Sequence, residues 1–295
     1  MQRNTLPWLA MLLPLLAAAG SAHAQNQKFD NIIIHKVTTN KYPQYRAYLA
    51  KLLEKICESG GTPLKGGPFD ADYGRKSLLI KETTYLSGRT QVVYRESYNW
   101  SKGDCDATLK PQRSVTFGSP TKKWKASLSI EGVPKFEDTS PAPTPETKAM
   151  MDDIAAFHLR RAAKARKKAA TRNYASRETH FGHECGYTGG IGAELGMEFC
   201  QLIASPVHEG TGTNLRLSYR NTRKPHFEGQ PVDCTRPPEE NVALFGYQVT
   251  RVCILNGVEV IYERFEVNAT IPKDVFEIPD FARDVARTTP AKVFK

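Results

Sequence analysis

The chain has 295 residues, of which 40% are hydrophobic and 24% are charged, and its formal net charge is +10. This is the composition of an ordinary globular protein, and the chain is long enough for one large β-rich domain or two small ones. Beyond residue 24 no apolar run approaches the length of a membrane helix, which excludes a helical membrane protein.

Residues 1–24 have the pattern of a secretory signal peptide. Arg3 precedes an apolar run from Trp8 to Ala19, and the small-residue motif Ala22-His23-Ala24 follows as a cleavage site. The run is too short to span a membrane. We therefore expect the mature protein to begin near Gln25 and to be periplasmic or secreted.

Six cysteines lie in the part expected to be exported: Cys57, Cys105, Cys185, Cys200, Cys234 and Cys253. An even number in an oxidising compartment indicates three disulfides, although six cysteines allow fifteen pairings. Pairing between sequence neighbours closes short loops, so we expect Cys57 with Cys105, Cys185 with Cys200, and Cys234 with Cys253. Ligation of a metal by the cysteines is less favoured than disulfide formation, because the sequence has no Cys-x-x-Cys pair.

The first half of the chain begins with a short strand at 31–35 and a helix over Tyr42–Glu58, whose apolar residues recur every three or four positions. From Ser77 onward the period changes to two. Apolar and polar residues alternate over 92–100 and 123–130, which predicts antiparallel strands with one solvated face. Four prolines in Pro134–Pro145 then indicate a linker or loop, because helix and strand interiors do not tolerate them.

A basic helix is predicted over residues 147–172. Its second half is almost wholly Ala, Lys and Arg, and eight Lys or Arg against three acids lie between Glu146 and Asn173. More than half of the excess positive charge therefore belongs to this element. Its first half has an apolar face formed by Met150, Met151, Ile154 and Phe157.

Strands are predicted again after the basic helix. Leu215, Leu217 and Tyr219 alternate with polar residues, and Asn256-Gly257 stands between the apolar runs 249–255 and 258–267. An Asn-Gly pair in that position is typical of a type I′ β-hairpin.

The last third of the chain resembles a known family. Asn268-Ala269-Thr270-Ile271-Pro272 and Val275-Phe276-Glu277-Ile278-Pro279, with the paired Cys185 and Cys200, are similar to segments of exported bacterial domains that look like the periplasmic lipoprotein-carrier (LolA/LolB-like) half-barrel. The resemblance covers about residues 176–285. It implies a curved antiparallel sheet whose concave side is covered by helices and encloses an apolar cavity. It implies no catalytic residues, because that family works by binding acyl chains.

We therefore expect an α+β fold that is mainly antiparallel β, with a curved sheet or half-barrel, an N-terminal helix and a central basic helix. The expected organisation is a signal peptide (1–24), an N-terminal part of a β-rich domain (25–135), a Pro-rich loop with the basic helix (136–175), and a C-terminal part of the β-rich domain (176–295). Whether the two strand sets form one sheet or two domains stays open.

Two groups of residues are candidate binding sites. Strand aromatics could line a ligand cavity, although such residues more often form sheet core: Tyr94, Tyr98, Trp100 and Trp124. Seven cations of the basic helix could contact phosphates of lipid headgroups or another polyanion, although a solvated Ala-rich helix explains them equally simply: Arg160, Arg161, Lys164, Arg166, Lys167, Lys168 and Arg172.

The sequence contains no strong motif for metal binding or catalysis. His180, His183 and Cys185 have a spacing seen in copper and zinc sites, but we expect Cys185 to be oxidised and the two histidines to point to opposite faces of a strand, so we predict no metal. Neither Gly-x-Ser-x-Gly nor His-Glu-x-x-His occurs, and nothing indicates a cofactor.

The expected function is that of an exported, non-enzymatic binding protein. Its sheet cavity would hold a lipid or another apolar or amphipathic ligand, and its basic helix would meet an anionic surface. A cavity-free interaction module that acts through residues 147–172 is the alternative, and an exported hydrolase is the second alternative.

Overall fold

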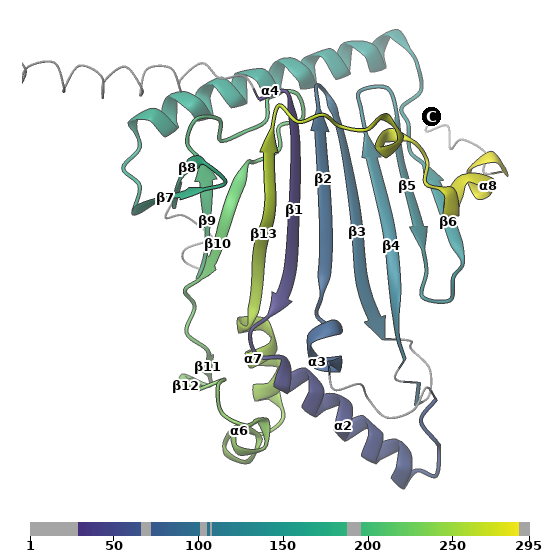
Figure 1. The fold of residues 1–295 in the computed structure, drawn as a ribbon, viewed down its shortest axis with the longest axis vertical. Helices are drawn as coiled ribbons and strands as arrows, with labels where there is room; N and C mark the ends of the chain where they lie inside the picture. Colours follow the sequence, from purple (N-terminus) through teal and green to yellow (C-terminus); the bar gives the residue numbers. More distant parts are fainter. Residues whose placement is uncertain (1–28, 66–71, 101–104, 107, 188–195, 289–295) are drawn as a thin grey trace, which may run out of the picture.

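The computed structural model describes residues 29–65, 72–100, 105–106, 108–187 and 196–288. The predicted signal peptide lies outside these residues. The fold is α+β with mostly antiparallel sheets, one of which curls into a half-barrel, as the sequence predicts (Figure 1). Among the described helices, none is long and apolar enough to cross a membrane.

A seven-stranded antiparallel sheet forms most of the structure, in the order β13-β1-β2-β3-β4-β5-β6. Chain neighbours pair from β1 to β6, and the C-terminal strand β13 closes the other edge against β1. The strands are β1 (Asn31–Asn40), β2 (Ile80–Ser87), β3 (Thr90–Trp100), β4 (Leu109–Gly118), β5 (Lys123–Leu128), β6 (Pro134–Asp138) and β13 (Val258–Val267).

A four-stranded sheet in the order β10-β9-β8-β7 packs beside β13 and β1. Its strands are β7 (Ser176–His180), β8 (His183–Tyr187), β9 (Met197–Leu202) and β10 (Arg216–Asn221), and a separate small ribbon pairs β11 (His226–Phe227) with β12 (Gln230–Pro231). Apolar side chains of both larger sheets join in one buried cluster, in which Ile32, Ile34 and Leu86 meet Leu202 and Leu217. The two strand sets therefore share a core.

Helices lie at both ends of the strands (Figure 1). At one end lie α2 (Pro43–Ser59), α3 (Tyr73–Lys76), α6 (Pro238–Phe245) and α7 (Gln248–Asn256). The long helix α4 (Pro145–Thr171) crosses the other end, and the C-terminal segment with η2 (Lys273–Phe276) and α8 (Asp280–Thr288) packs against β5 and β6. The helices predicted over Tyr42–Glu58 and 147–172 are thus confirmed as α2 and α4.

The two faces of the seven-stranded sheet differ, because side chains alternate along each strand. One face, here the covered face, buries Val92, Val115, Phe117, Trp124 and Ala126 beneath η2 and α8. The other, the open face, carries the polar residues that alternate with these along β3–β5. The predicted alternation in 92–100 and 123–130 is therefore real, and its polar half forms an accessible surface.

Two sequence predictions about turns are wrong. Residues 249–255 are not a strand but lie in α7, so Asn256-Gly257 joins a helix to β13, and Gly257 has an ordinary φ of −80°. Pro134–Asp138, predicted as loop, is the edge strand β6, where proline at the first position removes no ladder hydrogen bond that the sheet needs. Residues 139–144 alone remain irregular before α4.

Three disulfides are present, and the predicted pairing is confirmed: Cys57–Cys105, Cys185–Cys200 and Cys234–Cys253. The first ties the last turn of α2 to the segment before β4. The second is a diagonal bond between β8 and β9 within the shared core. The third holds α7 to the segment before α6, in a cluster with Tyr45 and Val249.

Candidate functional site

The open face of the seven-stranded sheet holds a groove with a volume of about 550 Å³. Its floor is formed by five neighbouring strands, β1 to β5, which contribute Thr38, Ile80, Arg95, Ser97, Gln112, Ser114, Lys125 and Ser127. The α3–β2 turn and the start of β13 border it at one end through Leu78, Leu79 and Val258. This volume is within the range typical of small-molecule binding sites, about 300–1,000 Å³.

Strand register explains why polar groups converge here. Arg95 lies opposite Ser114, and Ser114 lies opposite Ser127, so that one guanidinium and two hydroxyls follow each other across three strands. In the next row Ser97 lies opposite Gln112. Since directly paired residues project to the same face, the antiparallel pairing gathers side chains that are far apart in sequence into one polar floor.

Two cations of the groove, Arg95 and Lys125, have Glu82 and Glu137 as their respective cross-strand neighbours. Their side chains are nevertheless exposed and make no hydrogen bond or ion pair with any described residue. Glu82 is the cross-strand neighbour of Arg95, but its Oε1 atom lies 2.6 Å from Nζ of Lys36 and is therefore engaged elsewhere. The positive charge left in the groove favours an anionic group there.

The end of the groove next to α3 is apolar. Leu78, Leu79 and Val258 are half-buried and leave part of their hydrocarbon surface facing the groove. An apolar end and two free cations in one groove match a ligand that has a hydrocarbon part and an anionic part. This lining differs from the wholly apolar cavity that the family resemblance implies.

The predicted strand aromatics do not form one site. Trp124 is 1% exposed, stacks on Phe117 with 5.3 Å between ring centroids, and belongs to the covered face. The hydroxyl of Tyr94 donates to the carbonyl of Val275 at 2.8 Å, also on that face, where burial raises the pKa of Tyr94. Tyr98 lines the groove, and the side chain of Trp100 lies outside the described residues.

The cations of α4 divide into two groups. Arg161 points inward, donating to the carbonyl of Gly212 at 3.0 Å and to Oδ1 of Asn214 at 3.1 Å, and Arg166 pairs with Glu209. These two arginines attach the helix to the loop before β10. Five others are exposed and have no ion pair with the described residues: Lys148, Arg160, Lys164, Lys167 and Lys168. Arg172, also a predicted site residue, is the C-terminal cap of the helix.

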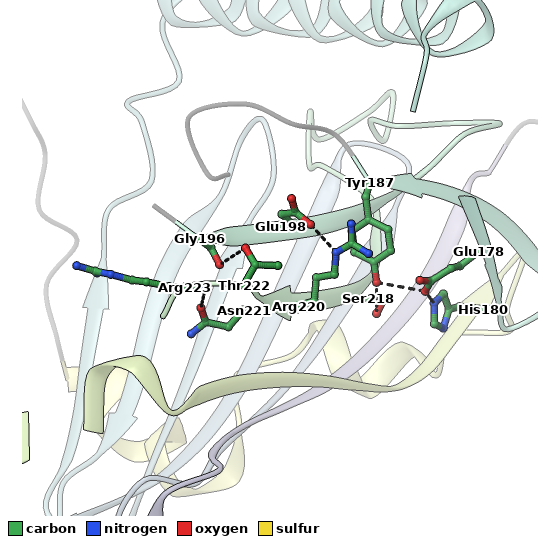
Figure 2. A network of polar contacts seen from close by, with 10 residues as sticks. All are labelled: Glu178, His180, Tyr187, Gly196, Glu198, Ser218, Arg220, Asn221, Thr222 and Arg223. Atoms are coloured by element: carbon green, nitrogen blue, oxygen red, sulfur yellow. Dashed lines mark hydrogen bonds and ion pairs between the residues drawn. The ribbon is translucent and has the colours of Figure 1, made fainter. Parts of the chain in front are cut away.

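A polar network covers the outer part of the four-stranded sheet (Figure 2). The Glu178 carboxylate accepts a hydrogen bond from His180 at 2.8 Å and one from the hydroxyl of Tyr187 at 3.2 Å, and these bonds lower the pKa of Glu178. The guanidinium of Arg220 lies 3.8 Å from the centroid of the Tyr187 ring and pairs with Glu198. Glu178, His180, Glu198 and Arg220 are thus paired with one another or with Tyr187, which is typical of a structural network.

The prediction that His180 and His183 point to opposite faces is wrong. Phe181 and Gly182 form a two-residue turn with φ of 53° and 76°, so β7 and β8 are a hairpin in which the two histidines are paired and share a face. Ligand atoms of His180, Cys185 and Cys200 lie within 4.8 Å of one another. Because the two sulfur atoms are bonded to each other, neither is a thiolate, and a zinc or copper ion needs thiolate here.

Sequence reasoning missed Arg95, Lys125 and the serines of the groove floor. Arg95, Ser97, Lys125 and Ser127 belong to the polar half of the predicted alternation, which indicates only a solvated face, whereas Ser114 lies in β4, for which no alternation is predicted. A signal was present, because the polar positions of 92–100 and 123–130 are rich in Ser, Arg and Lys but hold no acid on the groove side. Only the strand order shows that they meet.

Comparisons of the chain with protein-family models, with curated proteins and with solved structures found no match. The resemblance to the lipoprotein-carrier half-barrel therefore stays a prediction.

Proposed function

We propose that this protein is an exported, non-enzymatic binding protein whose groove on the open face holds an amphipathic ligand with an anionic group. The observation that carries the proposal is the pair of unpaired cations, Arg95 and Lys125, in a groove with an apolar end. Hydroxyl and amide groups between them offer further donors, so that a carboxylate or phosphate finds charge and hydrogen bonds together.

The composition of the groove supports binding rather than hydrolysis. Its described lining holds no Asp, Glu, His or Cys, so Ser97, Ser114 and Ser127 have no general base within the groove. A serine hydroxyl without such a base is a poor nucleophile but a good hydrogen-bond partner.

The alternative is a contact between α4 and an anionic surface. Arg160, Lys164, Lys167 and Lys168 favour it, because they are exposed and have no ion pair with the described residues. In this case the helix is the binding element and the groove is not required. Membrane headgroups and other polyanions share the phosphate chemistry that such a helix attracts.

A matched pair of amphiphiles tests the proposal. Dodecanoate and dodecyltrimethylammonium have similar hydrocarbon chains and opposite charge, and calorimetry measures the binding of each to the protein. We expect dodecanoate to bind about 5- to 30-fold more tightly, since two exposed charge contacts contribute about 0.5–1 kcal/mol each. Replacing Arg95 and Lys125 by Gln should remove this preference.

The matched control replaces by Gln four helix cations that are exposed and have no ion pair with the described residues: Arg160, Lys164, Lys167 and Lys168. This variant should keep the preference for dodecanoate if the groove is the site. Equal binding of the two amphiphiles to the wild type, or loss of the preference in the helix variant alone, would contradict the groove. Native mass spectrometry of protein from the periplasm of its own host, beside a denatured sample, then identifies any ligand carried in the cell.

A further inference from the structure

The outer side of α4 carries a line of exposed side chains that form no ion pair with the described residues. Met151, Ala162 and Ala169 are buried and mark the inner side of the helix. On the opposite side, residues spaced alternately by four and three positions are exposed, and this outer line of α4 consists of Glu146, Met150, Asp153, Phe157, Arg160, Lys164 and Lys167. Met150 is 49% and Phe157 is 55% exposed.

The charges of the outer line are ordered along the helix. Glu146 and Asp153 stand in its first half, Arg160 and Lys167 stand in its second half, and Phe157 lies between them. None of these four charges has an ion pair with the described residues, whereas Asp152, one position beside the line, contacts Arg89 at 3.4 Å. The cations also repel one another at spacings of three and four residues, which a partner of opposite charge would relieve.

We propose that the outer line of α4 is the interface with a second copy of this chain, in which the two α4 helices pack antiparallel about a twofold axis. Reversing the line brings Glu146 opposite Lys167 of the other copy and Asp153 opposite Arg160. The axis passes near Phe157, which then packs against its own copy. Such a surface is self-complementary, as a twofold interface requires.

Charge order favours a second copy over an anionic surface. A flat anionic surface that contacts Arg160 and Lys167 also meets Glu146 and Asp153, because all four lie on one side of a straight helix. A second copy satisfies both signs at once. The inference goes beyond the proposed ligand binding and does not depend on the groove, which lies on the sheet.

The expected association is weak and sensitive to salt. A single pair of helices buries less surface than a standard interface of about 1,600 Å² in total, which is typical of transient contacts. Its ion pairs lie at the surface, and the Debye length falls from about 10 Å at 0.1 M salt to about 3 Å at 1 M. We expect a dimer with a dissociation constant in the micromolar range at low salt and monomer at 1 M salt.

Charge exchange on the folded mature protein tests the interface by sedimentation velocity. Glu146→Lys with Asp153→Lys, or Arg160→Glu with Lys167→Glu, leaves like charges facing each other, and each double variant should dimerise about tenfold more weakly than the wild type. The variant with all four substitutions has the reverse charge order but is again self-complementary, so it should recover dimerisation. Circular dichroism verifies that α4 is intact in each variant.

Two apolar variants provide the matched control. Phe157→Ser should weaken the dimer, whereas Leu159→Ser should not, because Leu159 is 52% exposed on a different side of the helix. A wild type that stays monomeric at several hundred micromolar and low salt overturns the proposal, as does a folded four-substitution variant that fails to dimerise. Wild-type monomer that binds phosphatidylglycerol vesicles, with binding lost in the Arg160→Glu, Lys167→Glu variant, assigns the helix to an anionic surface instead.

Discussion

Whether a charged residue is available for binding depends on its neighbours more than on its type. Arg161 and Arg166 are fixed by the loop before β10, while Arg95 remains free because Lys36 already occupies Glu82. All three arginines look alike in the sequence. The structure therefore moves the candidate site from the basic helix, where cations are most numerous, to the sheet, where two of them share a groove.

His208 is a buried histidine that connects two distant segments of the chain. It is 2% exposed, its Nδ1 atom lies 2.9 Å from Oγ1 of Thr211, and its Nε2 atom lies 3.3 Å from the carbonyl oxygen of Asp30. Burial lowers the pKa of His208, because the surroundings disfavour the charged imidazolium. The residue ties the loop before β10 to the start of β1.

This burial predicts a loss of stability in weak acid. As the pH falls below about 6.5, His208 becomes protonated in the unfolded chain more readily than in the folded protein, where its pKa is lowered. The free energy of unfolding therefore decreases with falling pH. His208→Gln should lower stability at pH 7.5 and reduce its slope between pH 7 and 5, measured by urea unfolding. The exposed His226 is the control, since His226→Gln should leave the slope unchanged; an unchanged slope in the His208 variant would contradict the assignment.

The two long helices, whose ends are set by local sequence patterns, lie where the sequence predicts them. The three-and-four spacing that predicts α2 and α4 places both helices within two residues of their ends. The Asn256-Gly257 signal fails because residues before it are held in α7, where Val249, Cys253 and Asn256 are buried at helical spacing. The sequence itself contains this helical spacing, which competes with the Asn-Gly turn signal.

Gly257 is needed at the junction of α7 and β13 for space rather than for conformation. A Cβ atom on Gly257 would lie 2.1 Å from Oδ1 of Asn40, a buried residue whose side chain bonds the carbonyl of Ile254 and the backbone N–H of Tyr42. Gly257→Ala should therefore destabilise the protein by about 1–3 kcal/mol, and Gly257→Asn by more.

Thermal or urea unfolding checks this order. A type I′ turn would give the opposite result, since Asn is well tolerated where φ is positive. Gly118→Ala is the matched control: a Cβ there meets nothing within 4 Å and φ is not positive, so this variant should be as stable as the wild type or slightly more so.

At the scale of the whole molecule, the two larger sheets should unfold together. The shared core joins Ile32, Ile34 and Leu86 of one sheet to Leu202 and Leu217 of the other. Leu202→Ala, in β9, should lower the free energy of unfolding by about 2–5 kcal/mol. Trp124 lies in the seven-stranded sheet. In the Leu202→Ala variant, the unfolding midpoint measured by the fluorescence of Trp124 should therefore shift by the same amount as the midpoint measured by far-ultraviolet circular dichroism.

Separate transitions would contradict a single cooperative unit. If Leu202→Ala moved only part of the dichroism signal and left the fluorescence midpoint of Trp124 in place, the strand sets would behave as two domains. Val207→Ala, also buried and outside both larger sheets, is a useful comparison because it lies in the loop that contacts α4.

The sequence by itself determined the α+β class, the two long helices and the alternating strands, because each depends on spacing between residues that are close along the chain. It also determined where the positive charge is concentrated. Neighbour pairing of the six cysteines was an expectation among fifteen possibilities, and the structure decided it. Only the tertiary structure decided which polar residues meet in the groove, which arginines are free, and which side of α4 is exposed. Those properties depend on strand order and on contacts between residues far apart in the chain, which local periodicity does not contain.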